Sequence, residues 1–350
     1  MTTPTTSPAS DIDRETGLVA RVANELHLPL LGRGVVQSFH PTHLMLGSLA
    51  ALVVFGGGWL LDRTWIGIFD TDESPFGVLG AFWPTGGPAM FESRVQAFTR
   101  SLESHEFGVA LVLVLAMLIA SLFLGAIARS AALDMCAKCR AGLFPSMRFA
   151  VRRVVALLGA VGIPLVAIGM ALGLIKLFGL LLFSAGFTQP IGGVLFVVPL
   201  LIGLVVSIIA IAFALFHCML APATAIDEAD AIDAIQRAAG YLLGRPIRFV
   251  LYVVLFVILL NYAYALVQTI CRVAIGFADG ALPDAGLEKT DAAFTRDAIG
   301  FWVQMLWLVF IGWVISFYGS ASTVLYLIMR EACDGQDVSV MVSNDTPSLG

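Results

Sequence analysis

The segment from Arg129 to Arg153 constrains the fold more than any other part of the chain. It carries six Lys/Arg against one Asp and joins two apolar runs. Each run reaches the roughly 20 residues that span the hydrocarbon core of a bilayer. Short loops with excess Lys/Arg stay on the cytoplasmic side. The residues that we predict to set the topology are Arg129, Lys138, Arg140, Arg148, Arg152 and Arg153.

Composition excludes a soluble fold. The chain is 59% hydrophobic and only 13% charged, with a mean hydropathy of +0.91, against about 45–50% apolar and 25% charged in soluble domains. No basic stripe of the kind that binds nucleic acid is present. The expected partners are therefore membrane lipids and other membrane proteins, with no nucleic acid, while the oligomeric state cannot be inferred.

Length and lack of charge predict an all-α, polytopic bundle of six spans. An even count places both termini on one side, and we expect thirteen Lys/Arg on that cytoplasmic side against seven outside. The predicted spans are Leu44–Leu61, Phe107–Ile127, Val154–Leu174, Ile191–Phe213, Phe249–Ile270 and Phe301–Leu325.

The predicted domain organisation has three parts. Residues 1–43 form a cytoplasmic tail, residues 44–330 the transmembrane domain, and residues 331–350 a disordered cytoplasmic tail. In the first tail, Glu15–Gln37 has an amphipathic pattern interrupted at Pro29, typical of a helix on the membrane surface. The opening run Met1–Asp13 lacks the basic start of a signal peptide. We therefore expect an uncleaved first span. The lack of an Arg/Ser-rich organellar presequence favours a prokaryotic inner membrane.

Two regions leave their structure open. The apolar run Val154–Phe187 is too long for one perpendicular helix. Its end, past Lys176, is either a tilted continuation of the span or a short interfacial piece before Pro190. The loop Asp62–His105 is rich in Gly, Pro and aromatic residues, which favours an ordered cap at the outer interface.

A second amphipathic segment lies between the fourth and fifth spans. Asp227–Arg245 begins with acidic residues and ends with basic ones, an order that complements the helix dipole. The stretches Ala141–Phe149 and Tyr241–Phe249 share Leu, Arg and Phe at an offset of 100 residues. Either the chain repeats a unit of span, surface helix, Pro-containing turn and span, or the similarity is chance.

Polar side chains gather on one face of the fifth predicted span. Asn261, Ala265 and Gln268 recur at helical spacing with Tyr264 beside them, and Gln304 of the sixth span lies at a depth similar to that of Gln268. We expect this face to point inward. It either forms hydrogen bonds between helices or lines a path for a substrate.

Residues that could support catalysis or metal binding are sparse. No Asp, Glu, Lys, Arg or His lies near the middle of a predicted span, where such residues would be functional candidates. Cys136 and Cys139 lack the second pair of a zinc site, and His40 and His43 fit an interfacial pair. No nucleophile elbow, Walker loop or Rossmann pattern occurs. We therefore predict no enzyme activity, no cofactor and no metal.

One part of the chain resembles a known group of membrane proteins. Met219–Ile226, the acidic residues that follow, and Ala234–Pro246 resemble uncharacterised bacterial six-span proteins. These are similar to the membrane domain found alone or beside glycerophosphodiester phosphodiesterases. Tyr326–Arg330 with Asp334 and Gly335 looks like the C-terminal ending of a related family. The resemblance implies a six-helix membrane domain of unassigned activity and carries no catalytic residue.

The sequence leaves two hypotheses. The first is a non-enzymatic scaffold or accessory protein of the envelope. It rests on the amphipathic segments and the aromatic loop predicted at the membrane interface, and on the lack of an ionisable residue near the middle of a predicted span. The alternative is a transporter or lipid-handling protein with a polar path along the fifth and sixth spans.

Overall fold

In its described part, the protein is an all-helical membrane protein with six long apolar helices. The computed structural model describes residues 28–69, 74–76, 79, 106–183, 189–280 and 292–336, and within these ranges it has helices and no strand. Six helical segments are long and apolar enough to cross a bilayer, so the chain is a multi-pass membrane protein. They run over Pro41–Ile68, Gly108–Cys136, Val154–Phe183, Val197–Asp227, Pro246–Ala278 and Ala298–Asp334.

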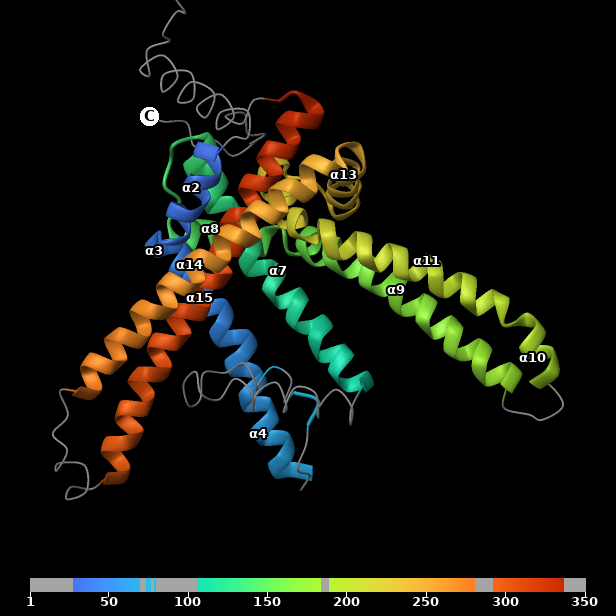
Figure 1. The fold of residues 1–350 in the computed structure, drawn as a ribbon, viewed down its shortest axis with the longest axis horizontal. Helices are drawn as coiled ribbons and strands as arrows, with labels where there is room; N and C mark the ends of the chain where they lie inside the picture. Colours follow the sequence, from blue (N-terminus) through green and yellow to red (C-terminus); the bar gives the residue numbers. More distant parts are fainter. Residues whose placement is uncertain are drawn as a thin grey trace, which may run out of the picture.

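The helices meet at one end and diverge at the other (Figure 1). The first span consists of α3 (Pro41–Ala51), the π-helix η1 (Leu52–Gly56) and α4 (Gly57–Phe69), and the second is α7 (Glu106–Cys136). α9 (Val154–Phe183) packs beside α11 (Val197–Phe216), and α14 (Pro246–Gly280) packs beside α15 (Ala292–Asp334).

Five shorter helices gather where the spans meet, and we call this end the junction. They are α2 (Leu28–Ser38), α8 (Leu143–Arg152), the 3₁₀ turn η3 (His217–Met219), α12 (Leu220–Asp227) and α13 (Ala231–Gly244). A further short helix, α10 (Gln189–Leu195), lies at the far end of α9 and α11. The largest cluster of buried apolar side chains is centred on the junction and includes Met219, Phe249, Phe317 and Tyr326.

Local sequence explains several helix boundaries. Pro41 opens α3, and the Nδ1 atom of His40 accepts a hydrogen bond from the Thr42 amide at 3.3 Å. Glu228 adopts a left-handed backbone (φ 51°), which ends α12. Pro246 opens α14 directly after Arg245, because the residue before a proline is disfavoured in a helix.

The predicted number and order of the six spans are confirmed, and each observed helical segment is longer than its prediction. The predicted start of the fourth span at Ile191 is wrong, because that residue lies in the separate helix α10 and the span begins at Val197. α9 continues through Lys176 to Phe183, which confirms the continuation and rules out a separate interfacial piece up to that residue. α15 extends to Asp334, so the predicted start of the disordered tail at 331 is wrong for its first four residues. Residues 337–350 of that tail lie outside the described part.

The predicted surface helices pack onto the bundle. The part of Glu15–Gln37 that is described, from Leu28, forms α2, which begins before Pro29 and packs against α15. α13 likewise buries Ala234, Ala238 and Tyr241 against neighbouring helices. α8 is closest to the expected surface helix, since Phe144, Arg148 and Val151 are exposed. Residues 15–27 and most of the aromatic loop after Phe69 lie outside the described residues.

The two stretches behind the predicted repeat occupy different positions. Leu143–Phe149 lies inside α8, whereas Leu243–Phe249 crosses from the end of α13 into the start of α14. Both units do contain a span, a short helix and a span. Pro145, however, lies in the first turn of the short helix, while Pro246 opens the long one. The aligned residues therefore do not play equivalent structural roles.

α3 and α15 approach each other closely at a pair of glycines. A Cβ atom on Gly47 would overlap the carbonyl oxygen of Gly312 and lie 2.9 Å from its carbonyl carbon. A Cβ on Gly312 would collide with Ser48. Small residues allow such close backbone approach in membrane helices. By contrast, a Cβ on Gly169 or Gly173 would meet no described atom within 4 Å.

Candidate functional site

A buried carboxylate lies at the centre of the junction. The Asp227 carboxylate accepts hydrogen bonds from Arg330 Nη1 at 2.6 Å, from Arg237 Nη1 at 2.8 Å, and from the Tyr326 hydroxyl. The side chains of Asp227 and Arg330 are 1% and 0% exposed. One acidic residue thus ties α12 to α13 and α15.

The next residue, Glu228, anchors a second pair of arginines. Its carboxylate lies 2.9 Å from Arg153 Nη2 and 3.8 Å from Arg129 Nη2. Arg129 also donates to the Ala225 carbonyl at 2.8 Å, and its guanidinium lies 4.6 Å from the centre of the Phe149 ring. Glu228 therefore joins the loop after α12 to α7 and to the start of α9.

Tyr241 extends the network to the end of α15. Its hydroxyl donates to the Asp334 carboxylate, and its ring lies 5.5 Å from that of Tyr326. Burial and the hydrogen bond to Asp334 raise the pKa of Tyr241 well above the usual phenol range. Although partial burial acts to lower the pKa of Arg237, the charge of Asp227 raises it above its usual value. Both groups therefore keep their protons at neutral pH.

The network is electrically balanced. Its four arginines are Arg129, Arg153, Arg237 and Arg330, and its four carboxylates are Asp227, Glu228, Asp230 and Asp334. Burying a charge is costly unless the charge is paired and hydrogen-bonded. Here each buried charge meets an opposite one. We refer to this set, with Tyr241 and Tyr326, as the charge network.

The length of α15 places the charge network near the edge of the membrane. A helix of 43 residues is about 65 Å long at 1.5 Å per residue, roughly twice the 30 Å hydrocarbon core. The last turns of α15, which carry Arg330 and Asp334, can therefore lie at the depth of the headgroups. A fully paired ionic cluster is tolerated there, because polar groups and water remain close.

A second polar group fixes the entry to the first span. Ser316 Oγ donates to the Ser38 carbonyl at 2.8 Å, and Trp313 Nε1 donates to Ser38 Oγ at 3.1 Å. Gln37 Nε2 donates to Asp134 on α7 at 2.9 Å. His43 is buried, with Nδ1 2.9 Å from the Gln37 carbonyl oxygen and 3.3 Å from Ser320 Oγ. These contacts are structural, since they connect the turn before α3 to α15 and α7.

No hydrogen bond joins the residues of the predicted polar path in the described part of the chain. Asn261 is exposed on α14 and donates to the Val257 carbonyl of its own helix at 2.7 Å, so the inward orientation is wrong for this residue. Tyr264 is 39% exposed and packs its ring 5.1 Å from that of Phe310. Gln268 and Gln304 are half-buried, and no hydrogen bond joins them within the described ranges.

The six basic residues predicted to set the topology fall into two groups. Arg129 and Arg153 belong to the charge network, and Arg129 is buried. The other four are exposed around α8: Lys138, Arg140, Arg148 and Arg152. Two of the six therefore hold helices together, besides adding to the positive charge on this side of the spans.

The contacts of the charge network were not predicted from the sequence. Asp227 and Glu228 were assigned to the start of a surface helix, and Arg330 to the end of the last span. The signal that could have revealed them is an acidic pair closing one long apolar segment and an arginine closing another. Charged residues that are buried need oppositely charged partners, and arginine is the usual partner of a buried carboxylate.

The chemistry available in the described residues is limited. They contain no group of three or more His, Cys, Asp or Glu that could hold a metal ion. The charge network joins α7, α9, α12, α13 and α15 through contacts of opposite charge, which suits a structural clamp. Comparison of the chain with protein-family models, with curated proteins and with solved structures finds no match.

Proposed function

We propose that the protein is a non-enzymatic scaffold or accessory protein of a bacterial inner membrane. The observation that supports this most is the contrast between the two ends of the molecule. The buried ionic side chains of the junction are paired with one another, whereas the described residues leave long apolar faces of the diverging spans uncovered. In the most apolar stretch of α14 only 11% of the residues are buried, against 39% in α7.

The outward face of α14 is a suitable place for a partner helix. Asn261 lies there between exposed apolar side chains, including Tyr262 and Leu266, which are 75% and 63% exposed. Its hydrogen bond to Val257 uses one amide hydrogen and leaves the amide oxygen and the other hydrogen available. Because lipid tails offer no hydrogen bonds, a neighbouring membrane helix that supplies them would be favoured at this position.

A photo-crosslinking amino acid at position 261 tests the scaffold proposal. We expect it to crosslink to a membrane protein that also co-purifies near stoichiometrically with the tagged chain in mild detergent. The control places the same amino acid at Phe256, which is 8% exposed on the same helix, and should give no intermolecular product. Adducts with lipid alone at position 261, without a co-purifying protein, would refute the proposal.

We further propose that the junction and both termini face the cytoplasm. Thirteen of the 20 Lys/Arg fall on that side of the six spans. In intact cells, a cysteine introduced within 284–291, a segment outside the described residues, should react with an impermeant thiol reagent. A cysteine that replaces Lys138 should react only after the membrane is opened. The reverse labelling pattern would invert the orientation.

Transport along α14 and α15 has weaker support. Asn261 faces outward, and Gln268 and Gln304 are not bonded to each other. Lipid handling, the other part of the alternative hypothesis, draws support from a cavity elsewhere in the molecule.

A further inference from the structure

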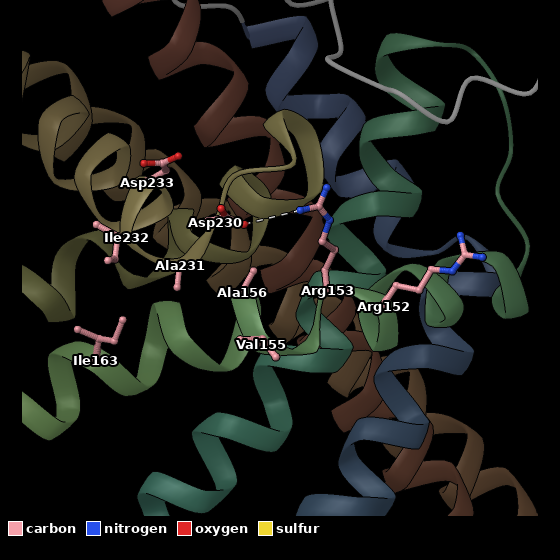
Figure 2. A pocket seen from close by; sticks show the side chains of 9 residues that line it. All are labelled: Arg152, Arg153, Val155, Ala156, Ile163, Asp230, Ala231, Ile232 and Asp233. Carbon is pink, nitrogen blue, oxygen red and sulfur yellow. Dashed lines mark ion pairs between the residues drawn. The ribbon is translucent and has the colours of Figure 1, made fainter.

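A cavity of about 580 Å³ lies between the end of α8, the start of α9 and the start of α13 (Figure 2). Its volume falls within the usual range for small-molecule sites, about 300–1,000 Å³. No residue of α14 lines the cavity. Ligand binding in the cavity is therefore a separate proposal from partner binding at α14.

The rim of the cavity carries both signs of charge, contributed by different helices. Arg152 and Arg153 stand on the α8–α9 side, and Asp230 and Asp233 stand on the α13 side (Figure 2). Arg153 Nη1 lies 3.9 Å from Asp230 Oδ1, but the Asp230 side chain is 85% exposed, and a pair as open as this is weak. The closer partner of Arg153 is Glu228, which lies 2.9 Å from Nη2. The four formal charges sum to zero.

The floor of the cavity is apolar. Val155 and Ile163 contribute from α9 and Ile232 from α13, with exposures of 81%, 47% and 59%. The apolar surface continues along α9 through Val166 and Met170, which are 59% and 63% exposed at helical spacing from Ile163. A ligand with a charged end at the rim and an apolar chain along α9 would cover both surfaces.

The depth of the cavity matches that of lipid headgroups. α9 begins at Val154, immediately after the two arginines, and then runs 30 residues almost without charge. The arginines and aspartates therefore lie where the apolar span ends. This is the level at which phosphate groups and their substituents are found in a bilayer.

We infer that the cavity binds a zwitterionic aminophospholipid. The phosphate would lie against Arg152 and Arg153, the primary ammonium against Asp230 and Asp233, and one acyl chain along Ile163, Val166 and Met170. A net-anionic headgroup lacks a cation for the two aspartates and is repelled by them. A quaternary ammonium fits less well, because it has no N–H to donate to a carboxylate.

The test places the full-length protein in nanodiscs of equal parts phosphatidylethanolamine, phosphatidylcholine and phosphatidylglycerol. The protein is then released from the nanodisc, and the lipids that stay bound to it are quantified by mass spectrometry. We expect phosphatidylethanolamine to be enriched. Asp233→Asn should lower its enrichment over phosphatidylcholine about two- to fivefold, as for partly exposed ion pairs. Arg152→Gln should reduce retention of both. The matched control Arg148→Gln is exposed on α8 but does not line the cavity, and should behave like the unmodified protein.

A second variant guards against a folding defect. Ile163→Trp fills the floor without touching a charge, and should also reduce phosphatidylethanolamine retention while the unfolding temperature stays unchanged. Equal retention of the three lipids, enrichment of phosphatidylglycerol, or equal loss in Arg148→Gln would overturn the proposal. Competition by soluble glycerophosphoethanolamine as strong as by the lipid would assign the site to a soluble phosphoamine and overturn the lipid part. None of these outcomes bears on crosslinking at position 261, so the two proposals fail separately.

Discussion

Asp227→Ala should destabilise the protein by about 3–5 kcal/mol, the cost of removing one partner from a buried ion pair. The substitution leaves the guanidinium of Arg330, whose side chain is 0% exposed, without its carboxylate. It also removes the acceptor for Arg237 and for the Tyr326 hydroxyl. The measurement is the thermal or denaturant unfolding of the purified protein in one detergent, followed by loss of helical signal and of monodisperse elution.

Two further variants distinguish the loss of the charge network's contacts from a non-specific effect of substituting a residue. Asp230→Asn changes a neighbouring aspartate whose side chain is 85% exposed and whose contact with Arg153 is 3.9 Å long. It should cost less than about 1 kcal/mol. The double variant Asp227→Leu with Arg330→Leu removes both buried charges and should recover much of the loss, because replacing a buried pair by apolar residues is often neutral. Equal stability of Asp227→Ala and Asp230→Asn would show that the network does not hold the junction together.

Gly47→Ala should destabilise the crossing of α3 and α15 by about 1–3 kcal/mol or more, the cost of overpacking a tight contact. The new methyl group would overlap the Gly312 carbonyl oxygen, and a backbone atom cannot rotate away as a flexible side chain can. α3 must therefore move away from α15, which strains the Ser38–Trp313 and Ser38–Ser316 hydrogen bonds. A fall in unfolding temperature in detergent, and a change in Trp313 fluorescence relative to the other tryptophans, would report this movement.

Gly169→Ala supplies the control for the helix crossing. A Cβ at Gly169 meets no described atom within 4 Å, and the residue lies in the interior of α9. Alanine has a helix propensity up to about 1 kcal/mol more favourable than glycine. We therefore expect this variant to be as stable as the unmodified protein or slightly more so. If Gly47→Ala proved equally harmless, the α3–α15 distance would have to be larger than described.

If Asp227→Ala and Gly47→Ala both destabilise the protein as expected, contacts at the junction contribute a large share of its stability. The charge network ties α7, α9, α12, α13 and α15, and the glycine crossing ties α3 to α15. The far parts of the spans are held mainly by neighbouring pairs of helices, with apolar faces left to lipid or to partners. A rigid base with open apolar faces is the arrangement that a scaffold for other membrane helices needs.

The number, order and approximate position of the six spans followed from the sequence by itself. Each span is a local property, because about 20 uncharged apolar residues must form a helix to satisfy their backbone in a bilayer. The predicted spans were shorter than the observed helices for the same reason. Apolar length shows where the hydrocarbon ends, but α7, α14 and α15 continue as helices beyond it, as α15 does to Asp334.

Only the tertiary structure decided which polar residues face inward. Helical spacing put Asn261 and Gln268 on one face of α14, yet a spacing does not say what that face meets, and Asn261 turned out to be exposed. Asp227 and Arg330 each close a long apolar segment, but the sequence does not show that they pair with each other across 103 residues at the centre of the charge network. The contact between Gly47 and Gly312 is likewise invisible locally. The physical reason is the same in each case: hydropathy is summed along the chain, whereas pairing depends on how separate helices rotate and cross.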